Sequence, residues 1–484
     1  MTSAHTSAEA RTDAHADTGI TGHFDVVVIG AGPAGEVVAG RCADNGLQVA
    51  IVERELVGGE CSYWGCMPSK VLLRPGDVVA AARRVPGAGA AVTGEIDTAE
   101  ALAWRNKVVG NFDDTNSLPW LTDRGIEVVR GRGRLTGTCT VEVADGSGTT
   151  RSLTARRAVV LATGTAAALP PIAGLEDTKP WTNREITATG KVPKRLLVLG
   201  GGAIGLEMAQ AFRRLGSRDV TVIEAASRIL IREEPYVADE VQAALEDEGI
   251  RFLIGAKVVA ARRRAGGTVV VTLEDGIECV GDVLLVAAGR KPNTEGLGLE
   301  AVGLQPGRSI EVDDQLRAKV EGGWLYAVGD CNGRSLLTHM GKYQARVAAD
   351  TILGRSAAAG SDHTAISRVT FTDPQVCAVG LTEEQAVTAG IKVAVVSYGT
   401  GDVAGGAVLG DGFVGTSKLV IDTSGEGGGV VVGATFVGPG VQELLHSATV
   451  AIVGKVPLQQ LWHAVPSFPT LSEVWLRLLE EYGL

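Results

Sequence analysis

Two cysteines, Cys61 and Cys66, lie in the segment GGECSYWGCMPSK with four residues between them, and Lys70 closes the segment. This spacing permits a short-loop disulfide, which could form and break by thiol–disulfide exchange. A thiol near a helix N-terminus is also stabilised as the thiolate by the helix dipole. Cysteine is, however, among the residue types most often buried. The spacing alone therefore fits a redox pair and two unrelated buried thiols equally well.

A first glycine-rich turn lies between a predicted strand and a predicted helix in FDVVVIGAGPAGEVVAGRCADNGLQVAIVER. It has the pattern GxGxxG, with Gly30, Gly32 and Gly35, and Glu53 stands at the end of the following β-run. Gly30 permits a tight turn, Gly32 lets the backbone approach a pyrophosphate, and Gly35 allows close helix packing. The helix N-terminus attracts phosphate, and the acid can hold a ribose hydroxyl pair. We therefore predict a dinucleotide site here rather than a purely structural turn.

The same pattern returns in RLLVLGGGAIGLEMAQAFRRLGSRDVTVIE, with Gly200, Gly202 and Gly205, and with Glu224 at the end of its second β-run. The chain therefore carries two dinucleotide-type units. An acid at Glu224 accepts hydrogen bonds from a free ribose 2′-hydroxyl and repels a 2′-phosphate, which predicts a preference for NADH over NADPH. Arg228 is either a phosphate ligand that weakens this preference or an arginine of a surface loop.

The composition is typical of a globular protein that acts on a small molecule. A length of 484 residues is enough for about three domains. A content of 45% hydrophobic residues excludes an intrinsically disordered chain. The net charge of -11 argues against a protein that binds nucleic acid or an anionic membrane, because such proteins need a positively charged surface. No apolar run approaches the roughly 18 residues of a membrane-spanning helix.

The cysteine usage and the N-terminal segment predict a cytoplasmic protein. Seven irregularly spaced cysteines do not form a disulfide scaffold. They also lack zinc-type spacing, so no metal site is expected. Residues 1–22 have neither the basic start nor the apolar core of a secretory signal, and we expect a disordered tail there. The cysteines outside the pair are interpreted as having no chemical role, mostly as buried small residues in helices or β-runs: Cys42, Cys139, Cys279, Cys331 and Cys377.

An ordered series of motifs resembles the FAD-dependent pyridine nucleotide-disulfide oxidoreductases, which include lipoamide dehydrogenase, glutathione reductase and mercuric reductase. From Phe24 onward the motifs are GAGPAG with Glu53, GGECSYWGCMPSK, ATGT, GGGAIGLE with Glu224, AAGRKPNT, YAVGD, FTDPQVCAVGLTEEQA and PTLSE. The resemblance implies an α/β fold with two Rossmann-like dinucleotide-binding domains, one for FAD and one for NAD(P)H, and a C-terminal α/β dimerisation domain. It also implies a homodimer with a shared active site.

The resemblance also divides the chain after the tail at residues 1–22. The FAD-binding domain is expected in two parts, residues 23–165 and 281–360. The NAD(P)H-binding domain is expected between them at residues 166–280, and the dimerisation domain at residues 361–484.

Particular residues take roles from the resemblance. Cys66 would contact the flavin ring and Cys61 would exchange with the substrate. Lys70 and Glu207 would form a pair near the flavin N5. Hydride would pass from nicotinamide to flavin to disulfide, and thiolate attack would then pass the electrons to an acceptor. Further cofactor-binding residues are expected in the later motifs, namely Gly164, Gly289, Asp330 and Thr338.

The chain departs from the family at Phe468, where disulfide-reducing relatives carry a histidine that handles the thiol proton. A phenyl ring neither accepts nor donates a proton, so this help to Cys61 is lost. Glu473 of the same segment is retained and is expected to be catalytic. We therefore expect an unusual acceptor, such as a quinone, a metal ion or a specialised disulfide, in a pocket near Phe468 and Trp462.

Three other functions stay open. The chain could run the electrons backwards and oxidise a dithiol with NAD⁺, with Glu473 and a water as the base. It could also be a quinone or metal reductase, although it lacks the C-terminal cysteine pair of mercuric reductase. Finally, it could be a flavoprotein that senses redox state without turnover.

Overall fold

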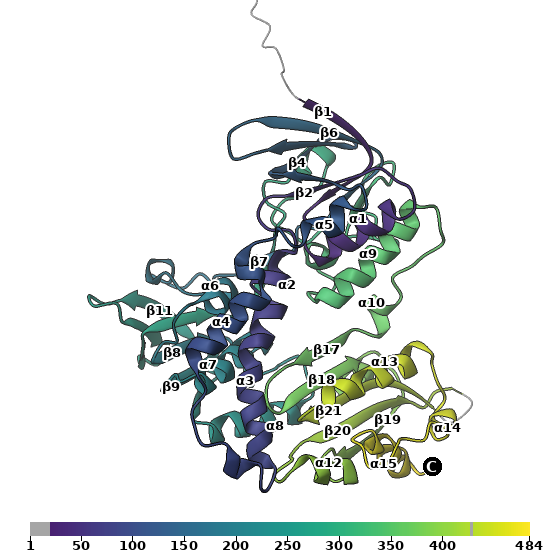
Figure 1. The fold of residues 1–484 in the computed structure, drawn as a ribbon. Helices are drawn as coiled ribbons and strands as arrows, with labels where there is room; N and C mark the ends of the chain where they lie inside the picture. The colour runs from purple at the N-terminus through teal and green to yellow at the C-terminus, as the bar shows by residue number, and fades with distance from the viewer. Residues whose placement is uncertain (1–19, 426–428) are drawn as a thin grey trace, which may run out of the picture.

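A computed structural model describes residues 20–425 and 429–484 (Figure 1). Of the tail expected at residues 1–22, residues 1–19 lie outside the described part, and residues 20–22 begin strand β1. Among the described residues, no helix is both long and apolar enough to cross a membrane.

The first βαβ unit belongs to a seven-stranded sheet with the order β3-β2-β1-β6-β5-β4, and β16 pairs with β6. Strand β1 is parallel to both neighbours, and Val27 pairs with Ala50 and with Val159. These strands are runs of buried Val, Ile and Leu, as expected of a parallel sheet covered on both faces. Helices α1 and α9 pack side by side on one face (Figure 1). The elements are β1 (Ile20–Ile29), α1 (Pro33–Ala43), β2 (Val49–Glu53), β3 (Glu127–Arg130), β4 (Arg132–Gly137), β5 (Thr140–Ala144), β6 (Thr150–Leu161), β16 (Leu325–Ala327) and α9 (Thr338–Ile352).

The second βαβ unit has a four-stranded parallel sheet with the order β10-β9-β8-β14. A three-stranded antiparallel sheet, β11-β12-β13, packs with it, and the short pair β7 and β15 joins it to the first unit. The elements are β7 (Thr165–Ala167), α6 (Asn183–Ala188), β8 (Arg195–Leu199), α7 (Ala203–Arg214), β9 (Asp219–Glu224), α8 (Pro235–Asp247), β10 (Ile250–Ile254), β11 (Val258–Arg263), β12 (Val269–Leu273), β13 (Glu278–Gly281), β14 (Val283–Val286) and β15 (Arg290–Pro292).

The C-terminal part is a five-stranded antiparallel sheet, β17-β18-β21-β20-β19, covered by α13 and α15. Its elements are α10 (Ser361–Thr364), β17 (Ser367–Thr370), β18 (Gln375–Gly380), α11 (Glu383–Thr388), β19 (Val393–Gly399), α12 (Ala404–Leu409), β20 (Thr416–Asp422), β21 (Val430–Gly438), α13 (Leu445–Val453), α14 (Leu458–Leu461) and α15 (Glu473–Tyr482). The predicted fold class, two Rossmann-like units and a C-terminal α/β domain, is confirmed.

Helices inserted after β2 carry the cysteine segment. They are α2 (Gly59–Tyr63), α3 (Cys66–Arg84), α4 (Thr98–Val108) and α5 (Leu118–Thr122). Helix α3 runs between α4 and α7 on one side and the C-terminal sheet on the other (Figure 1). The cysteine segment therefore lies where all three parts of the chain meet.

The cysteines outside the pair are placed as expected, with one correction. Cys42, Cys279 and Cys377 are buried in α1, β13 and β18, and Cys331 is buried in its loop. Cys139 lies instead in the turn between β4 and β5, is only partly buried and has φ +56°. Threonine and valine neighbours predict a β-run here, and the single Gly137 before Cys139 is a weak turn signal.

Candidate active site

The first glycines of the two GxGxxG turns adopt a conformation that favours glycine. Gly30 has φ +104° and Gly200 has φ +115°. A Cβ atom at Gly30 would lie 2.4 Å from the Ala162 carbonyl oxygen, and one at Gly200 would lie 2.5 Å from that of Ala287. Each turn thus passes directly against the end of a neighbouring strand, where a side chain has no room.

The second and third glycines serve two different needs. A Cβ atom at Gly35 or Gly205 would lie 1.9 or 2.1 Å from the carbonyl oxygen of the first glycine in its own turn. At Gly32 and Gly202, by contrast, nothing lies within 4 Å of a Cβ position. This open space is at the N-termini of α1 and α7, where backbone N–H groups and the helix dipole attract anions. Both turns therefore fit the pyrophosphate of a dinucleotide.

Glu53 and Glu224 occupy equivalent places in the two units, and each carboxylate accepts two backbone N–H groups. The distances are 2.8 and 2.7 Å at Glu53 and 2.6 Å twice at Glu224. Burial raises the pKa of Glu53, and its two backbone hydrogen bonds oppose that shift. The donors are Ala31 and Glu55 in the first unit, and Gly201 and Ala226 in the second. The sequence placed both acids at strand ends but did not reveal these donors.

Arg228 is engaged by its own loop. Its guanidinium donates to the backbone carbonyl oxygens of Leu230, Ile231 and Glu233 at 3.0, 3.0 and 2.8 Å, and to Ile229 at 3.5 Å. Of the two interpretations left open by the sequence, the structure favours the loop arginine. A phosphate ligand at this position would have to replace these contacts.

Cys66 is the first residue of α3, and Cys61 lies in the short helix α2 before it. Both are partly buried free thiols, and the Cys66 sulfur lies 3.2 Å from the Thr338 hydroxyl oxygen. A hydrogen bond from Cys61, together with that from Thr338 and the charge of Lys70, lowers the pKa of Cys66 to about 6 against the effect of burial. The same bond and burial raise the pKa of Cys61. These opposite shifts favour the thiolate on Cys66 over a thiolate on Cys61.

Lys70 and Glu207 form an ion pair beside the cysteines. Lys70 is one turn after Cys66 on α3, and its Nζ lies 2.8 Å from the Glu207 carboxylate on α7. Glu207 is 4% exposed and also accepts the backbone N–H of Phe371 at 3.0 Å. The Lys70 ammonium lies 4.6 Å from the centroid of the Phe371 ring. The pair thus ties the cysteine helix to the second unit and to the C-terminal part.

A cavity of about 510 Å³ brings together residues from five sequence motifs. Asp330 lies in its wall, accepts the Thr165 hydroxyl at 2.7 Å, and has its pKa raised by burial. The buried Thr163 hydroxyl also lines it and has no hydrogen-bond partner among the described residues. An unpaired polar atom beside an open pyrophosphate space fits a bound cofactor. The expected site residues in the wall are Gly30, Gly32, Glu53, Cys61, Gly164, Asp330 and Thr338.

The remaining expected residues lie outside that wall, among them Gly35, Cys66 and Lys70. Gly200, Gly202, Gly205 and Glu224 form the second turn. Gly289 has φ +146° and precedes β15, and its carbonyl accepts the backbone N–H of Ala168. The structure therefore separates two candidate nucleotide sites, one in each unit.

Phe468 and Glu473 do not line the cavity that contains Cys61 of the same chain. Phe468 is 75% exposed, whereas Glu473 is 7% exposed at the start of α15. One carboxylate oxygen of Glu473 is buried without a hydrogen-bond partner among residues 20–425 and 429–484. Large apolar side chains around this segment are also exposed, including Val465 and Trp462.

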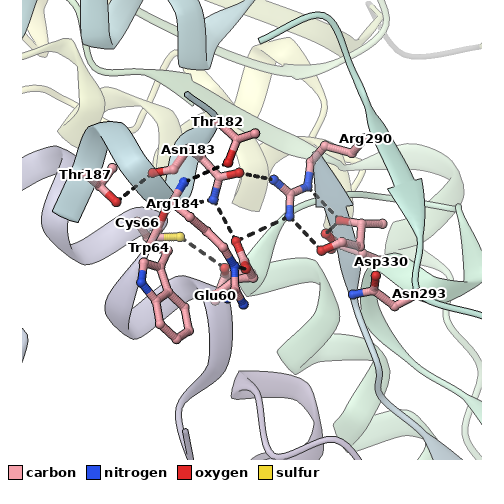
Figure 2. Close-up of polar contacts among 12 residues, drawn as sticks. Glu60, Trp64, Cys66, Thr182, Asn183, Arg184, Thr187, Arg290, Asn293 and Asp330 are labelled. Carbon is pink, nitrogen blue, oxygen red and sulfur yellow. Dashed lines mark hydrogen bonds and ion pairs between the residues drawn. The ribbon is translucent and has the colours of Figure 1, made fainter. Parts of the chain in front are cut away.

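A polar network that the sequence analysis missed surrounds the cysteine turn (Figure 2). Glu60 pairs with Arg184 at 2.5 Å and lies 3.7 Å from Arg290. Arg184 also packs 4.0 Å from the Trp64 ring centroid. Asn183 on α6 donates to Glu60 and to the Trp64 carbonyl. Glu60 and Trp64 belong to the cysteine motif and Arg290 to AAGRKPNT, but no motif marks Asn183 or Arg184. The sequence did not indicate the network, because its members meet only in the folded chain.

Comparison with known proteins agrees with this geometry. The family model "Pyridine nucleotide-disulphide oxidoreductase" matches residues 24–349, and that of the dimerisation domain of the same family matches residues 366–478. A dihydrolipoyl dehydrogenase of Chlorobaculum tepidum is 35% identical over 471 residues, covering 95% of this chain and 96% of the relative. A mercuric reductase of Lysinibacillus sphaericus is 30% identical over 456 residues, covering 93% and 81%.

Two solved structures are similar throughout. One is the Cu(II) complex of the HOCl-induced flavoprotein disulfide reductase RclA from Escherichia coli, with a TM-score of 0.83 and 26% identity. The other is LpdA from Mycobacterium tuberculosis, also with a TM-score of 0.83 and 26% identity. Each alignment covers 95% of this chain and 99% of the other. The dimerisation-domain match supports a homodimer. The chain belongs to the family of FAD-dependent pyridine nucleotide-disulfide oxidoreductases.

Proposed function

We propose that this oxidoreductase passes electrons from NADH through FAD to the Cys61/Cys66 pair, and from there to an acceptor other than an ordinary small disulfide. The observation that carries the proposal is the placement of the pair: Cys61 lines the cavity, and the Cys66 sulfur lies 3.2 Å from the hydroxyl of Thr338 in the same wall. When bound, FAD supplies electron transfer between a nicotinamide and a disulfide. The residues that would hold it line the 510 Å³ cavity, chiefly Gly32, Glu53 and Asp330.

Reduction of a disulfide by the Cys61/Cys66 pair takes two exchange steps, and the first of them needs a base. To reduce a substrate disulfide, the Cys61 sulfur bonds to one substrate sulfur and releases the other as a thiolate. The Cys66 thiolate then attacks the Cys61 sulfur, forms the Cys61–Cys66 disulfide and releases the second substrate thiolate. NADH then returns the pair to one thiol and one thiolate, since the hydride supplies two electrons and one proton. The first step requires a base for Cys61, because its raised pKa keeps it protonated.

The missing base at Phe468 supports an unusual acceptor. We propose that Phe468 and Glu473 of one subunit face Cys61 of its partner, which agrees with their absence from the cavity of their own chain. A phenyl ring there favours an apolar acceptor such as a quinone over a charged disulfide. The unpaired Glu473 oxygen is the one carboxylate on this segment that could take a proton.

The nucleotide preference rests on the second unit. The Glu224 carboxylate is fixed by two backbone N–H groups at the strand end, where a ribose would lie. Arg228, the nearby cation, is occupied by backbone carbonyls. We therefore propose that NADH is preferred over NADPH.

A metal ion is a second candidate acceptor. The relative from Escherichia coli was solved as a Cu(II) complex, and here a thiolate lies beside a second thiol. The reverse reaction, dithiol oxidation by NAD⁺, uses the same pair and is the activity named for the dihydrolipoyl dehydrogenase relatives. Dithiol oxidation also needs a base to remove the thiol proton, so the phenylalanine at Phe468 makes this reaction a weaker candidate.

The test is an anaerobic titration of the purified flavoprotein with NADH, following the flavin spectrum and the free thiols. We expect a long-wavelength thiolate-to-flavin charge-transfer band together with new thiols on Cys61 and Cys66. Cys61→Ser should retain flavin reduction and lose acceptor turnover, while Cys139→Ser, a partly buried thiol outside the site, should behave as the parent. Bleaching of the flavin with no charge-transfer band and no new thiols would contradict the proposal. It would indicate that electrons pass from the flavin directly to the acceptor. Slow reduction without release to any acceptor would indicate a redox sensor.

A further inference from the structure

The turn that carries Cys61 has little to hold it locally. Helix α2 has only five residues and no side-chain N-cap. Two glycines with positive φ, Gly58 and Gly59, lead into it at +109° and +58°. A helix of this length does not persist by itself in water. Its position must therefore come from contacts with other elements.

Asn183 supplies contacts at both ends of this turn (Figure 2). Its side-chain Nδ2 donates to the Glu60 carboxylate at 2.7 Å and to the Trp64 carbonyl oxygen at 2.9 Å. Glu60 is the residue before Cys61, and Trp64 follows that cysteine by three positions. One amide group on α6 therefore spans the turn and both of its N–H groups are used.

The orientation of the Asn183 amide is fixed by its third contact. Its Oδ1 accepts from Arg290 at 3.3 Å, and Arg290 in turn donates to Thr165, whose hydroxyl donates to Asp330 in the cavity. Rotating the amide by half a turn would direct its oxygen at the Glu60 carboxylate and its N–H groups at a guanidinium. Asn183 is 7% exposed, so water does not compete strongly for these bonds.

We propose that Asn183 is a positioning residue, which holds residues 60–64 and thereby fixes the Cys61 thiol relative to Cys66. The inference rests on the proposed function, since it assigns this thiol pair to catalysis. Three side chains lower the pKa of Cys66, namely Cys61 from α2, Thr338 from α9 and Lys70 from its own helix. Only the first depends on the turn, and it has the largest effect on the pKa of Cys66.

The experiment measures thiolate directly in the reduced, anaerobic holoenzyme. The rate of Cys66 alkylation by iodoacetamide is followed against pH by peptide mass mapping. In the parent, the rate should reach half its maximum near the pKa of about 6. Asn183→Ala removes both donated bonds, and Asn183→Asp keeps the shape but sets a carboxylate against Glu60. In each, the midpoint should rise by about one pH unit, which means about tenfold less thiolate at acid pH.

A matched control separates positioning from simple damage to helix α6. Glu185→Ala removes the capping box in which Glu185 accepts from Thr182, and leaves the Asn183 side-chain bonds in place. It should keep the parent midpoint. An unchanged midpoint in Asn183→Ala, or an equal shift in Glu185→Ala, would overturn the inference. If Asn183→Asp fails to retain flavin, Asn183→Ala decides the matter.

Failure of the proposed function would look different. In that case the parent itself would form no new thiols on titration with NADH, whatever the alkylation midpoints of the variants. If the parent forms both thiols and the Asn183 variants keep its alkylation midpoint, the positioning role of Asn183 is refuted and the proposed function stands.

Discussion

Two glycines of the same turn should separate folding from nucleotide binding. Gly202 and Gly205 both lie at the N-terminus of α7, yet a Cβ atom at Gly202 meets nothing within 4 Å, whereas one at Gly205 would lie 2.1 Å from a backbone oxygen. Gly202 has φ −83°, which alanine adopts without strain. Gly202→Ala should therefore fold like the parent, and Gly205→Ala should not.

The magnitudes follow from these two environments. In Gly205→Ala the new methyl group would overlap the Gly200 carbonyl oxygen, so the backbone must move to make room for it. The free energy of unfolding should therefore fall by about 1–3 kcal/mol or more. In Gly202→Ala the added methyl group takes the space into which a pyrophosphate would fit. The pyrophosphate could then no longer approach the backbone of the turn closely. The Kd for NADH should rise about tenfold, which is a loss of about 1.4 kcal/mol in binding free energy.

The assay combines urea unfolding, followed by tryptophan fluorescence, with the NADH concentration dependence of flavin reduction in rapid mixing. Gly202→Ala should keep the unfolding midpoint and the flavin content of the parent while its apparent Kd for NADH rises. Gly32→Ala is the matched variant in the first unit, where the Cβ position is also open, and should lose flavin instead. NADH binding by Gly202→Ala with the parent's affinity would refute the assignment of this turn to the nicotinamide nucleotide.

Three further results are expected. The charge-transfer absorbance of the reduced enzyme should persist above a pH of about 6 and fade below it, because the lowered pKa of Cys66 keeps its thiolate until protons bind at that pH; an anaerobic pH titration of the spectrum checks this, and a midpoint near 9 would contradict it. Glu224→Ala should erode the preference for NADH, measured as the ratio of kcat/KM for NADH and NADPH, and equal use of both by the parent would refute the preference itself. Phe468→His should raise turnover of lipoamide or of another small disulfide, with Phe413→His as a control substitution on the C-terminal domain, and no gain would mean that more than the proton relay has diverged.

The sequence alone predicted the fold class, and it located the two glycine-rich turns that the structure contains. A local rule governs these turns: the tight turn from strand to helix gives Gly30 and Gly200 a positive φ, which favours glycine. The acids Glu53 and Glu224 were predicted at the ends of the second β-runs, and they are the last residues of β2 and β9. The motif order then identified the family, which the comparisons confirmed.

Only the tertiary structure determined the environment that shifts the pKa values of Cys61 and Cys66. Spacing could not separate a redox pair from two buried thiols, because the pKa of Cys66 depends on Thr338, far away in the sequence, and on the placement of Cys61. Arg228 likewise has two sequence interpretations until its loop folds back to engage it. Asn183 had no signal at all, since a buried amide gains its role only from the groups that packing brings around it. Hydrogen bonds and desolvation act over a few ångströms in space, and only the folded chain fixes which groups are that close.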